Sequence, residues 1–329
     1  MIDLKICDIC GTFNLKENNY CTHCGNKLVP EHFCHHCGAP NLDYATTCAK
    51  CKKQINPIII DDYDVLFSKL NEDLLADARI SDIEYGELLN RIFMRAEYIP
   101  IYGNTAKEKI LNLSRIFTPC KAKSRGYEWG YNFLGNCIYY DDRLDDSIQI
   151  ATVIHELAHY FVFTIFESLL CDIFNVKTSP TLQSFVWYFL TLPEFKIMNE
   201  YCAHTVEGRF VPYGYQNYGS FNALVENTDL DDDSLMTMMK FGNSFANEII
   251  VHLERYINNQ LRQEIKLQYK RDLKSPKNDS VFIETDDCFS LSVKNSLMLK
   301  FLHEIFIESS DIEARKELEL IKEGIEINW

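Results

Sequence analysis

The sequence predicts an α+β fold that is mostly helical, carries a small sheet, and is preceded by a cysteine-rich segment. Three observations support this prediction. Helical periodicity dominates from about residue 147 to the C-terminus. Residues 118–141 interleave glycines with aromatic and β-branched residues, which is typical of short strands joined by turns. Eight of the 13 cysteines lie within the first 51 residues.

The composition indicates an ordinary globular protein. The chain has 329 residues, of which 47% are hydrophobic and 25% charged. Its 33 basic and 48 acidic residues give a formal net charge of −15, which argues against a broad basic surface for nucleic acid. We see no signal peptide, and apolar runs such as 160–163 and 185–190 are far shorter than the roughly 20 residues that span a bilayer. We therefore expect a cytoplasmic protein without a membrane contact.

The N-terminal cysteines form an internal repeat. They occur as four C-x-x-C pairs, and the second two pairs follow the first two at a spacing of 27 residues. The pairs are Cys7/Cys10, Cys21/Cys24, Cys34/Cys37 and Cys48/Cys51. Two such pairs supply the four thiolates of a tetrahedral zinc site, whereas disulfides would suit a secreted chain. We predict two structural zinc ions bound by sequential pairs, with interleaved pairing as the alternative.

Residues 5–53 resemble the double zinc ribbon found at the ends of many bacterial proteins. Zinc would stabilise modules of this size, which are too small for a hydrophobic core. Residues 1–55 contain six lysines and five acidic residues, so they form no strong basic patch. We expect a docking or spacer module that binds a protein partner, with nucleic-acid binding as the less favoured alternative.

Three further regions are expected after this module. They are a helical lead-in (56–130), a core that carries the chemistry (131–230) and a C-terminal helical region (231–329). Ser81 and Glu84 form a capping box that predicts a helix running to about Tyr98, before Pro100. A second helix is expected over 105–117.

The strongest chemical signal is His155-Glu156-Leu157-Ala158-His159, an HExxH motif. Residues i and i+4 share one face of a helix, so both imidazoles can bind one zinc ion. Glu156 lies about 100° further around the helix and can contact water at the metal without being a ligand. It is the candidate general base.

A catalytic zinc ion usually has three protein ligands and one open position, so a third ligand must come from elsewhere. A predicted helix over 193–210 places Glu200, His204 and Glu207 on one face. Glu200 is the preferred ligand. His204 is the alternative ligand, or else a residue that orients an imidazole or the substrate. Glu207 is expected to support the site from behind or to be a solvated charge.

The donor that stabilises the oxyanion stays open among three residues: His204, Tyr213 and Tyr215. For the two tyrosines, simple aromatic packing is the alternative. The predicted strand over 137–140 could pair with an extended peptide substrate if it lies at a sheet edge.

One family resemblance follows from these residues. The sequence HELAHYF (155–161), with a short strand in 135–144 before it and Glu200–Ala203 (E-x-x-A) and Val211–Pro212 after it, resembles the ImmA/IrrE-type zinc metallopeptidases. The resemblance covers about residues 130–215. SprT-like and other gluzincin-like peptidases are neighbouring families.

This resemblance implies a zincin-like fold for the core, with Glu200 as the third ligand of a catalytic zinc ion. It also implies a zinc-dependent endopeptidase whose substrate is an intracellular, regulatory protein. The competing hypothesis is a non-catalytic, zinc-stabilised adaptor or regulator. The two differ in the fourth coordination position of the metal, which is open in an enzyme and occupied by a side chain in a structural site.

Overall fold

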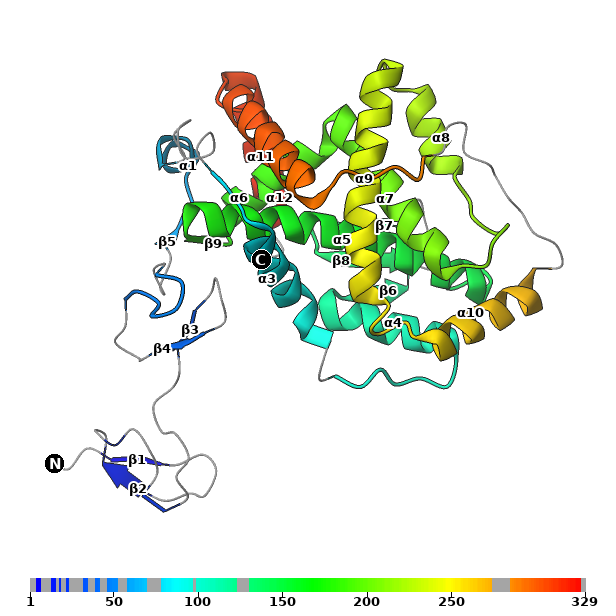
Figure 1. Cartoon of the computed structure of the whole chain (residues 1–329), viewed down its shortest axis with the longest axis horizontal. Coiled ribbons are helices and arrows are strands. Elements are labelled where there is room, and N and C mark those ends of the chain that lie inside the picture. The colour runs from blue at the N-terminus through cyan, green and yellow to red at the C-terminus, as the bar shows by residue number, and fades with distance from the viewer. Residues whose placement is uncertain are drawn as a thin grey trace. The chain divides into compact units, whose positions relative to one another are not determined.

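The chain is mostly helical with a small sheet, as the sequence predicts for its α+β class (Figure 1). The structure is a computed structural model, and two compact units can be distinguished in it: Met1–Ile58 with Asn175–Lys177, and Ile59–Phe174 with Thr178–Trp329. The residues that it describes are 4–6, 13–15, 18, 22–23, 32–34, 39–41, 46–52, 58–69, 78–96, 99–122, 130–273 and 285–326.

The first unit contains two short antiparallel strand pairs, β1 (Leu4–Ile6) with β2 (Phe13–Leu15) and β3 (His32–Phe33) with β4 (Pro40–Asn41). A separate two-stranded sheet joins β5 (Ile58–Ile59) and β9 (Val176–Lys177). The sequence repeat is also a structural repeat. Asn14 Oδ1 accepts a 2.9 Å hydrogen bond from the N–H of Thr22, and Asn41 Oδ1 accepts one of 2.9 Å from the N–H of Ala49. Both asparagines are buried, and both bonds recur at the 27-residue spacing.

The sheet of the second unit has three strands in the order β6-β8-β7. β6 (Cys120–Ala122) is parallel to β8 (Cys137–Tyr140), and β7 (Gly130–Asn132) is antiparallel to it. The condition for peptide pairing by the strand over 137–140, a position at a sheet edge, is therefore not met. β8 is the middle strand, and its hydrogen-bonding groups on both sides face neighbouring strands. The edge strand on the antiparallel side is β7.

The helices begin where local sequence signals place them. Ser81 and Thr105 are N-caps, and each forms a complete capping box with the glutamate three residues later. The first of these helices ends at Phe93, earlier than expected, and a 3₁₀ turn follows (Met94–Ala96). The helices are α1 (Tyr63–Lys69), α3 (Asp82–Phe93), α4 (Ala106–Phe117), α5 (Asp146–Phe174), α6 (Pro180–Thr191), α7 (Pro193–Phe210), α8 (Gly219–Glu226), α9 (Asp232–Leu253), α10 (Asn259–Asp272), α11 (Leu291–Glu308) and α12 (Ile312–Glu326).

Helix α5 forms the centre of the second unit. It has 29 residues, and four of its apolar side chains around the motif are at most 1% exposed: Val153, Ile154, Leu157 and Ala158. By length and composition it is the one helix in the described part of the chain that could cross a membrane. Most of it is buried inside the protein, as in the core helix of a globular domain.

Helices α7 and α9 pack closely because α9 carries a glycine at their crossing. A Cβ atom on Gly242 would lie 2.5 Å from the carbonyl oxygen of Met198 and 3.2 Å from the N of Cys202. The backbone of α7 therefore lies directly against α9 at this point. Met198 and Cys202 stand two residues before and two residues after Glu200. This contact therefore fixes the position of Glu200 along the axis of α7 and its direction around that axis.

Candidate metal centre

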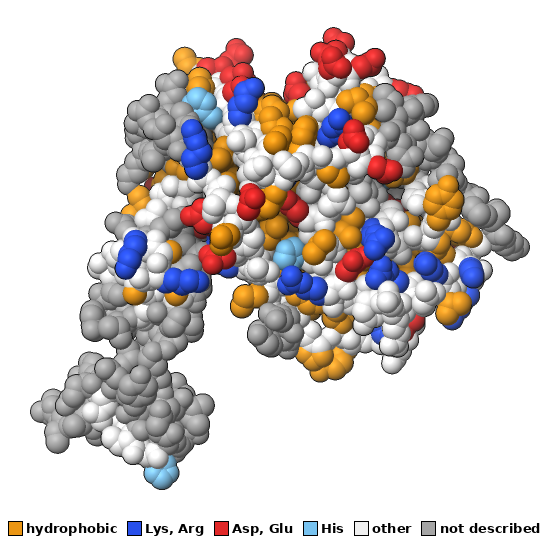
Figure 2. Space-filling model, in the orientation of Figure 1, with side chains coloured by type: hydrophobic (Ala, Val, Ile, Leu, Met, Phe, Trp, Pro, Cys, Tyr) orange, Lys and Arg blue, Asp and Glu red, His pale blue; other side chains and the backbone are white. Residues whose placement is uncertain are grey.

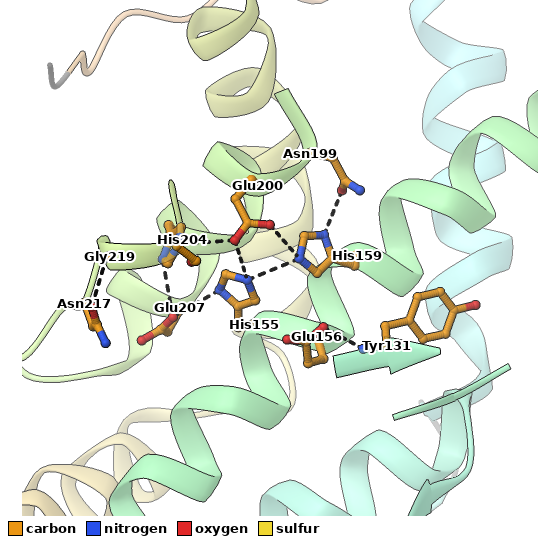
Figure 3. Close-up of polar contacts among 11 residues, drawn as sticks. Tyr131, His155, Glu156, His159, Asn199, Glu200, His204, Glu207, Asn217 and Gly219 are labelled. Atoms are coloured by element: carbon orange, nitrogen blue, oxygen red, sulfur yellow. Dashed lines mark hydrogen bonds and ion pairs between the residues drawn. The ribbon is translucent and has the colours of Figure 1, made fainter. Parts of the chain in front are cut away.

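Three side chains from two helices converge on one point. His155 and His159 come from α5, and Glu200 comes from α7 (Figure 3). The Nε2 atoms of the two imidazoles are 3.2 Å apart. Glu200 Oε1 lies 3.6 Å from His155 Nε2, and its Oε2 lies 3.4 Å from His159 Nε2.

These distances match the edges of a metal coordination polyhedron. Ligand atoms about 2.1 Å from one zinc ion at tetrahedral angles are about 3.4 Å from one another. The three observed separations lie between 3.2 and 3.6 Å. The residues therefore fit a metal ion, and the donor set of two imidazoles and one carboxylate is a common one for zinc.

The far side of each imidazole is also held. His155 Nδ1 lies 3.2 Å from Glu207 Oε2, and His159 Nδ1 lies 3.0 Å from Asn199 Oδ1. Both partners are hydrogen-bond acceptors, so each Nδ1 carries the proton and each Nε2 presents a lone pair. Two lone pairs 3.2 Å apart repel unless a cation or a proton lies between them. Glu207 is 8% exposed, which agrees with the supporting role and not with a solvated charge.

His204 lies beside this site. Its Nε2 is 3.5 Å from Glu200 Oε1 and 2.9 Å from Ser220 Oγ, on the first turn of α8. Its Nδ1 is 3.7 Å from Glu207 Oε2, and its ring lies 4.5 Å from that of His155. A second group of donor atoms comes from His155, His204 and Glu207, which are all buried. His204 is thus in contact with the proposed ligand Glu200 and with Glu207, which bonds Nδ1 of His155.

Burial and hydrogen bonding work against each other in this cluster. Burial would raise the pKa of Glu200, but hydrogen bonds with His155, His159 and His204 hold it well below its usual value. In the same way, the pKa of Glu207 falls to about 2. Burial would lower the pKa of His155, yet its bonds to Glu200 and Glu207 raise it well above 6.5. Two buried carboxylates therefore demand positive charge nearby, which protons or a metal ion can supply.

Glu156 faces a different neighbour. Its Oε2 accepts a 2.7 Å hydrogen bond from the backbone N–H of Tyr131, in β7. Figure 3 shows its carboxylate turned toward this strand, away from Glu200. The base candidate thus lies between the metal donors and the edge of the sheet.

The structure does not bring Tyr213 and Tyr215 to the metal donors. The side chain of Tyr213 is 93% exposed, and the ring of Tyr215 packs against Tyr269 at 5.4 Å. Neither tyrosine contacts a donor within the described residues. Tyr218 does lie near the site, with its ring 5.0 Å from the ring of His204.

Asn199, Ser220 and Tyr218 are not among the residues predicted from the sequence. Asn199 directly precedes Glu200 and lies one turn before Ala203, so helix periodicity could have suggested it. Ser220 and Tyr218 follow a loop, where sequence spacing does not predict proximity.

A second possible metal site lies in the first unit. The Sγ atoms of Cys34, Cys48 and Cys51 lie within 4.8 Å of one another, and those of Cys34 and Cys51 are 3.4 Å apart. Asn41 Nδ2 lies 3.5 Å from Cys48 Sγ, a distance suited to an amide that donates to a thiolate. The five remaining cysteines of the predicted sites lie outside the described residues: Cys7, Cys10, Cys21, Cys24 and Cys37.

Comparison with known proteins adds no relative. No protein-family model matches the chain, and no curated protein or solved structure is significantly similar to it.

Proposed function

We propose that the chain is a cytoplasmic, zinc-dependent endopeptidase with a zincin-like core. The observation that carries this proposal is the convergence of His155, His159 and Glu200, with separations suited to one zinc ion. The order of these residues, an HExxH helix followed by a glutamate on a later helix, supports the resemblance to the ImmA/IrrE-type peptidases. By that analogy the substrate is an intracellular, regulatory protein.

In this proposal each residue has a distinct task. Bound zinc would act as a Lewis acid toward the scissile carbonyl and lower the pKa of water. His155, His159 and Glu200 hold the ion, while Glu207 and Asn199 keep the two imidazoles in the ligating tautomer.

Two residues handle protons and charge. Glu156 takes a proton from the attacking water and passes it to the leaving amine. His204, which lies 3.5 Å from Glu200 Oε1, is the candidate donor to the developing oxyanion.

We also propose two structural zinc ions in the N-terminal module. The thiols of Cys34, Cys48 and Cys51, together with Cys37, would hold one ion, and the first set of pairs the other. The repeated asparagine bonds support two equivalent modules. On the described part of the face in Figure 2, Lys and Arg side chains lie near Asp and Glu side chains. Within the N-terminal module itself, the six lysines and five acidic residues of positions 1–55 favour a protein partner over nucleic acid.

Metal analysis combined with an activity assay tests this function. Wild-type protein should contain three zinc ions per chain, and His155→Ala and Glu200→Ala should each contain two. Wild-type protein should cleave unfolded casein. Glu156→Gln should keep all three ions and lose turnover, because an amide cannot accept the proton. Cleavage by Glu156→Gln at the wild-type rate would refute the mechanism.

The alternative is a non-catalytic adaptor or regulator, and the position of His204 favours it in one respect. Its Nε2 is close enough to Glu200 for a small shift to bring it onto the same metal ion. Four protein ligands would close the site to water. The absorption spectrum of the cobalt-substituted protein distinguishes the two, because His204→Ala would change it strongly only if His204 is a ligand.

A further inference from the structure

Tyr131 is the residue of β7 whose backbone N–H and C=O point away from β8. This residue lies opposite Ile138 of β8, in the antiparallel pair. The N–H of Ile138 is used on the other side of β8, where it donates to the carbonyl of Pro119 at 2.8 Å. In an antiparallel ladder the two residues of a pair either bond each other or both face away. The N–H and C=O of Tyr131 therefore face the side of β7 on which no strand of the described residues pairs, and this side is the free edge of the sheet.

The chain's own Glu156 occupies this position. The Tyr131 N–H donates to Glu156 Oε2 at 2.7 Å, and the carboxylate also lies over the neighbouring Gly130. A Cβ atom on Gly130 would be 3.5 Å from Oε2 and 3.8 Å from Oε1. Gly130 has φ +142°, a conformation that other residues rarely adopt. The backbone of β7 thus has an unusual conformation, and no side chain, at the point where the Glu156 carboxylate lies.

An open strand edge is a site at which another extended chain can add. An added strand would place one of its carbonyl oxygens on the Tyr131 N–H, where Glu156 Oε2 now lies. One N–H cannot serve both acceptors fully, and a carboxylate accepts more strongly than a peptide carbonyl. Peptide addition at this edge and the present position of Glu156 therefore compete.

We propose that Glu156 plugs the free edge of β7 and that an extended polypeptide segment displaces it. The segment takes the Tyr131 N–H, and the released carboxylate becomes free to turn toward His155 and His159. This inference rests on the proposed function, since it makes the base available only when a substrate strand is in place. It also defines the ligand class: a flexible segment of a protein that can become extended, and not a folded surface.

Peptide binding by zinc-free protein tests whether Glu156 plugs the strand edge. Without zinc, neither peptide cleavage nor coordination of the metal by a peptide contributes to the measured binding. Wild type, Glu156→Gln and Glu156→Ala are applied with a chelator to an array of random twelve-residue peptides. We expect Glu156→Ala to bind at least fivefold more tightly than wild type, with Glu156→Gln between them. Glu226→Ala, which removes an exposed charge on α8, controls for net charge and should match wild type.

Amide hydrogen exchange over residues 130–132 gives a second readout. Exchange of the Tyr131 amide should be at least tenfold faster in Glu156→Ala than in wild type, and a bound peptide should slow it again. The inference is overturned if Glu156→Ala retains no peptide, if it binds no better than wild type, or if exchange at Tyr131 is unchanged.

The casein assay separates this inference from the proposed function. If casein is cleaved but the peptide-binding test fails, only the proposal that Glu156 plugs the strand edge is refuted. If the peptide-binding test succeeds but no casein is cleaved, β7 is a peptide-binding edge and the proposed peptidase activity is refuted.

Discussion

Replacing Gly242 by alanine should damage the metal site without touching any of its residues. The added Cβ would lie 2.5 Å from the carbonyl oxygen of Met198, and ordinary contacts begin at 3.4 Å. The helices α7 and α9 must therefore separate by about 0.9 Å, or the backbone must distort by a similar amount. Because Met198 and Cys202 bracket Glu200, the shift moves this carboxylate relative to the histidines of α5.

Two opposing terms set the size of the effect. Alanine in a helix interior is favoured over glycine by up to about 1 kcal/mol. Overpacking in a closed interface costs about 1–3 kcal/mol, and here the Met198 oxygen and the Cys202 nitrogen belong to backbone that cannot rotate away. We expect a net loss of about 1–2 kcal/mol in the free energy of unfolding. We also expect at least a tenfold loss of zinc affinity at the His155 site, since the donor separations of 3.2–3.6 Å leave little room for displacement.

The assay compares Gly242→Ala with Gly86→Ala. A Cβ on Gly86, in α3, would meet nothing within 4 Å. The control should therefore gain up to about 1 kcal/mol in urea unfolding and bind zinc as wild type does. Zinc affinity is measured by competition with a chromogenic chelator. If Gly242→Ala gains stability like the control and keeps its zinc affinity, the close packing of α7 on α9 does not position Glu200.

Three further predictions concern buried charge. Glu207→Ala should weaken zinc binding about 10- to 100-fold while the three ligands remain, because His155 loses the partner that fixes its tautomer; a chelator titration measures this. Metal-free protein should be most stable between about pH 4.5 and 6.5 in urea unfolding. The depressed pKa of Glu207 adds stability that is lost as the pH falls toward 2. The raised pKa of His155 adds stability that is lost as the pH rises above 6.5. Lys294 is fully buried and bonds Glu248 at 2.7 and 2.8 Å, so Lys294→Met alone should cost about 3–5 kcal/mol, whereas adding Glu248→Leu should restore most of this.

Each of these predictions has a contradicting result. Unchanged zinc affinity in Glu207→Ala would show that the Nδ1 bond of His155 is dispensable. A flat stability profile from pH 4.5 to 9 would show that His155 gains nothing from its carboxylates. A double variant no more stable than Lys294→Met would show that the buried pair is not a unit.

The parts of the fold that are predictable from sequence are those that local physics decides. The capping boxes at Ser81 and Thr105 involve residues three apart, so they can be recognised without tertiary information. The same holds for His155 and His159, whose spacing alone puts both rings on one face of α5. Glu200 could be anticipated because a metal site of this type requires a third donor.

The parts that sequence did not predict depend on how distant segments meet. The middle position of β8 follows from a parallel pairing with β6, which a pattern of aromatic residues does not encode. The acceptor for His159 depends on the rotation of α7 about its axis, which the contact at Gly242 sets. Tyr213 and Tyr215 follow the ligand helix closely in sequence, yet the chain turns them away after Pro212.

The paired asparagines of the N-terminal unit have an evolutionary consequence. Asn14 and Asn41 each satisfy a backbone amide eight residues further on, inside their own 27-residue segment. Each of these two bonds thus stays within its own 27-residue segment. A tandem array built in this way can lengthen or shorten by whole copies through recombination, and every remaining copy keeps the bonds that it needs.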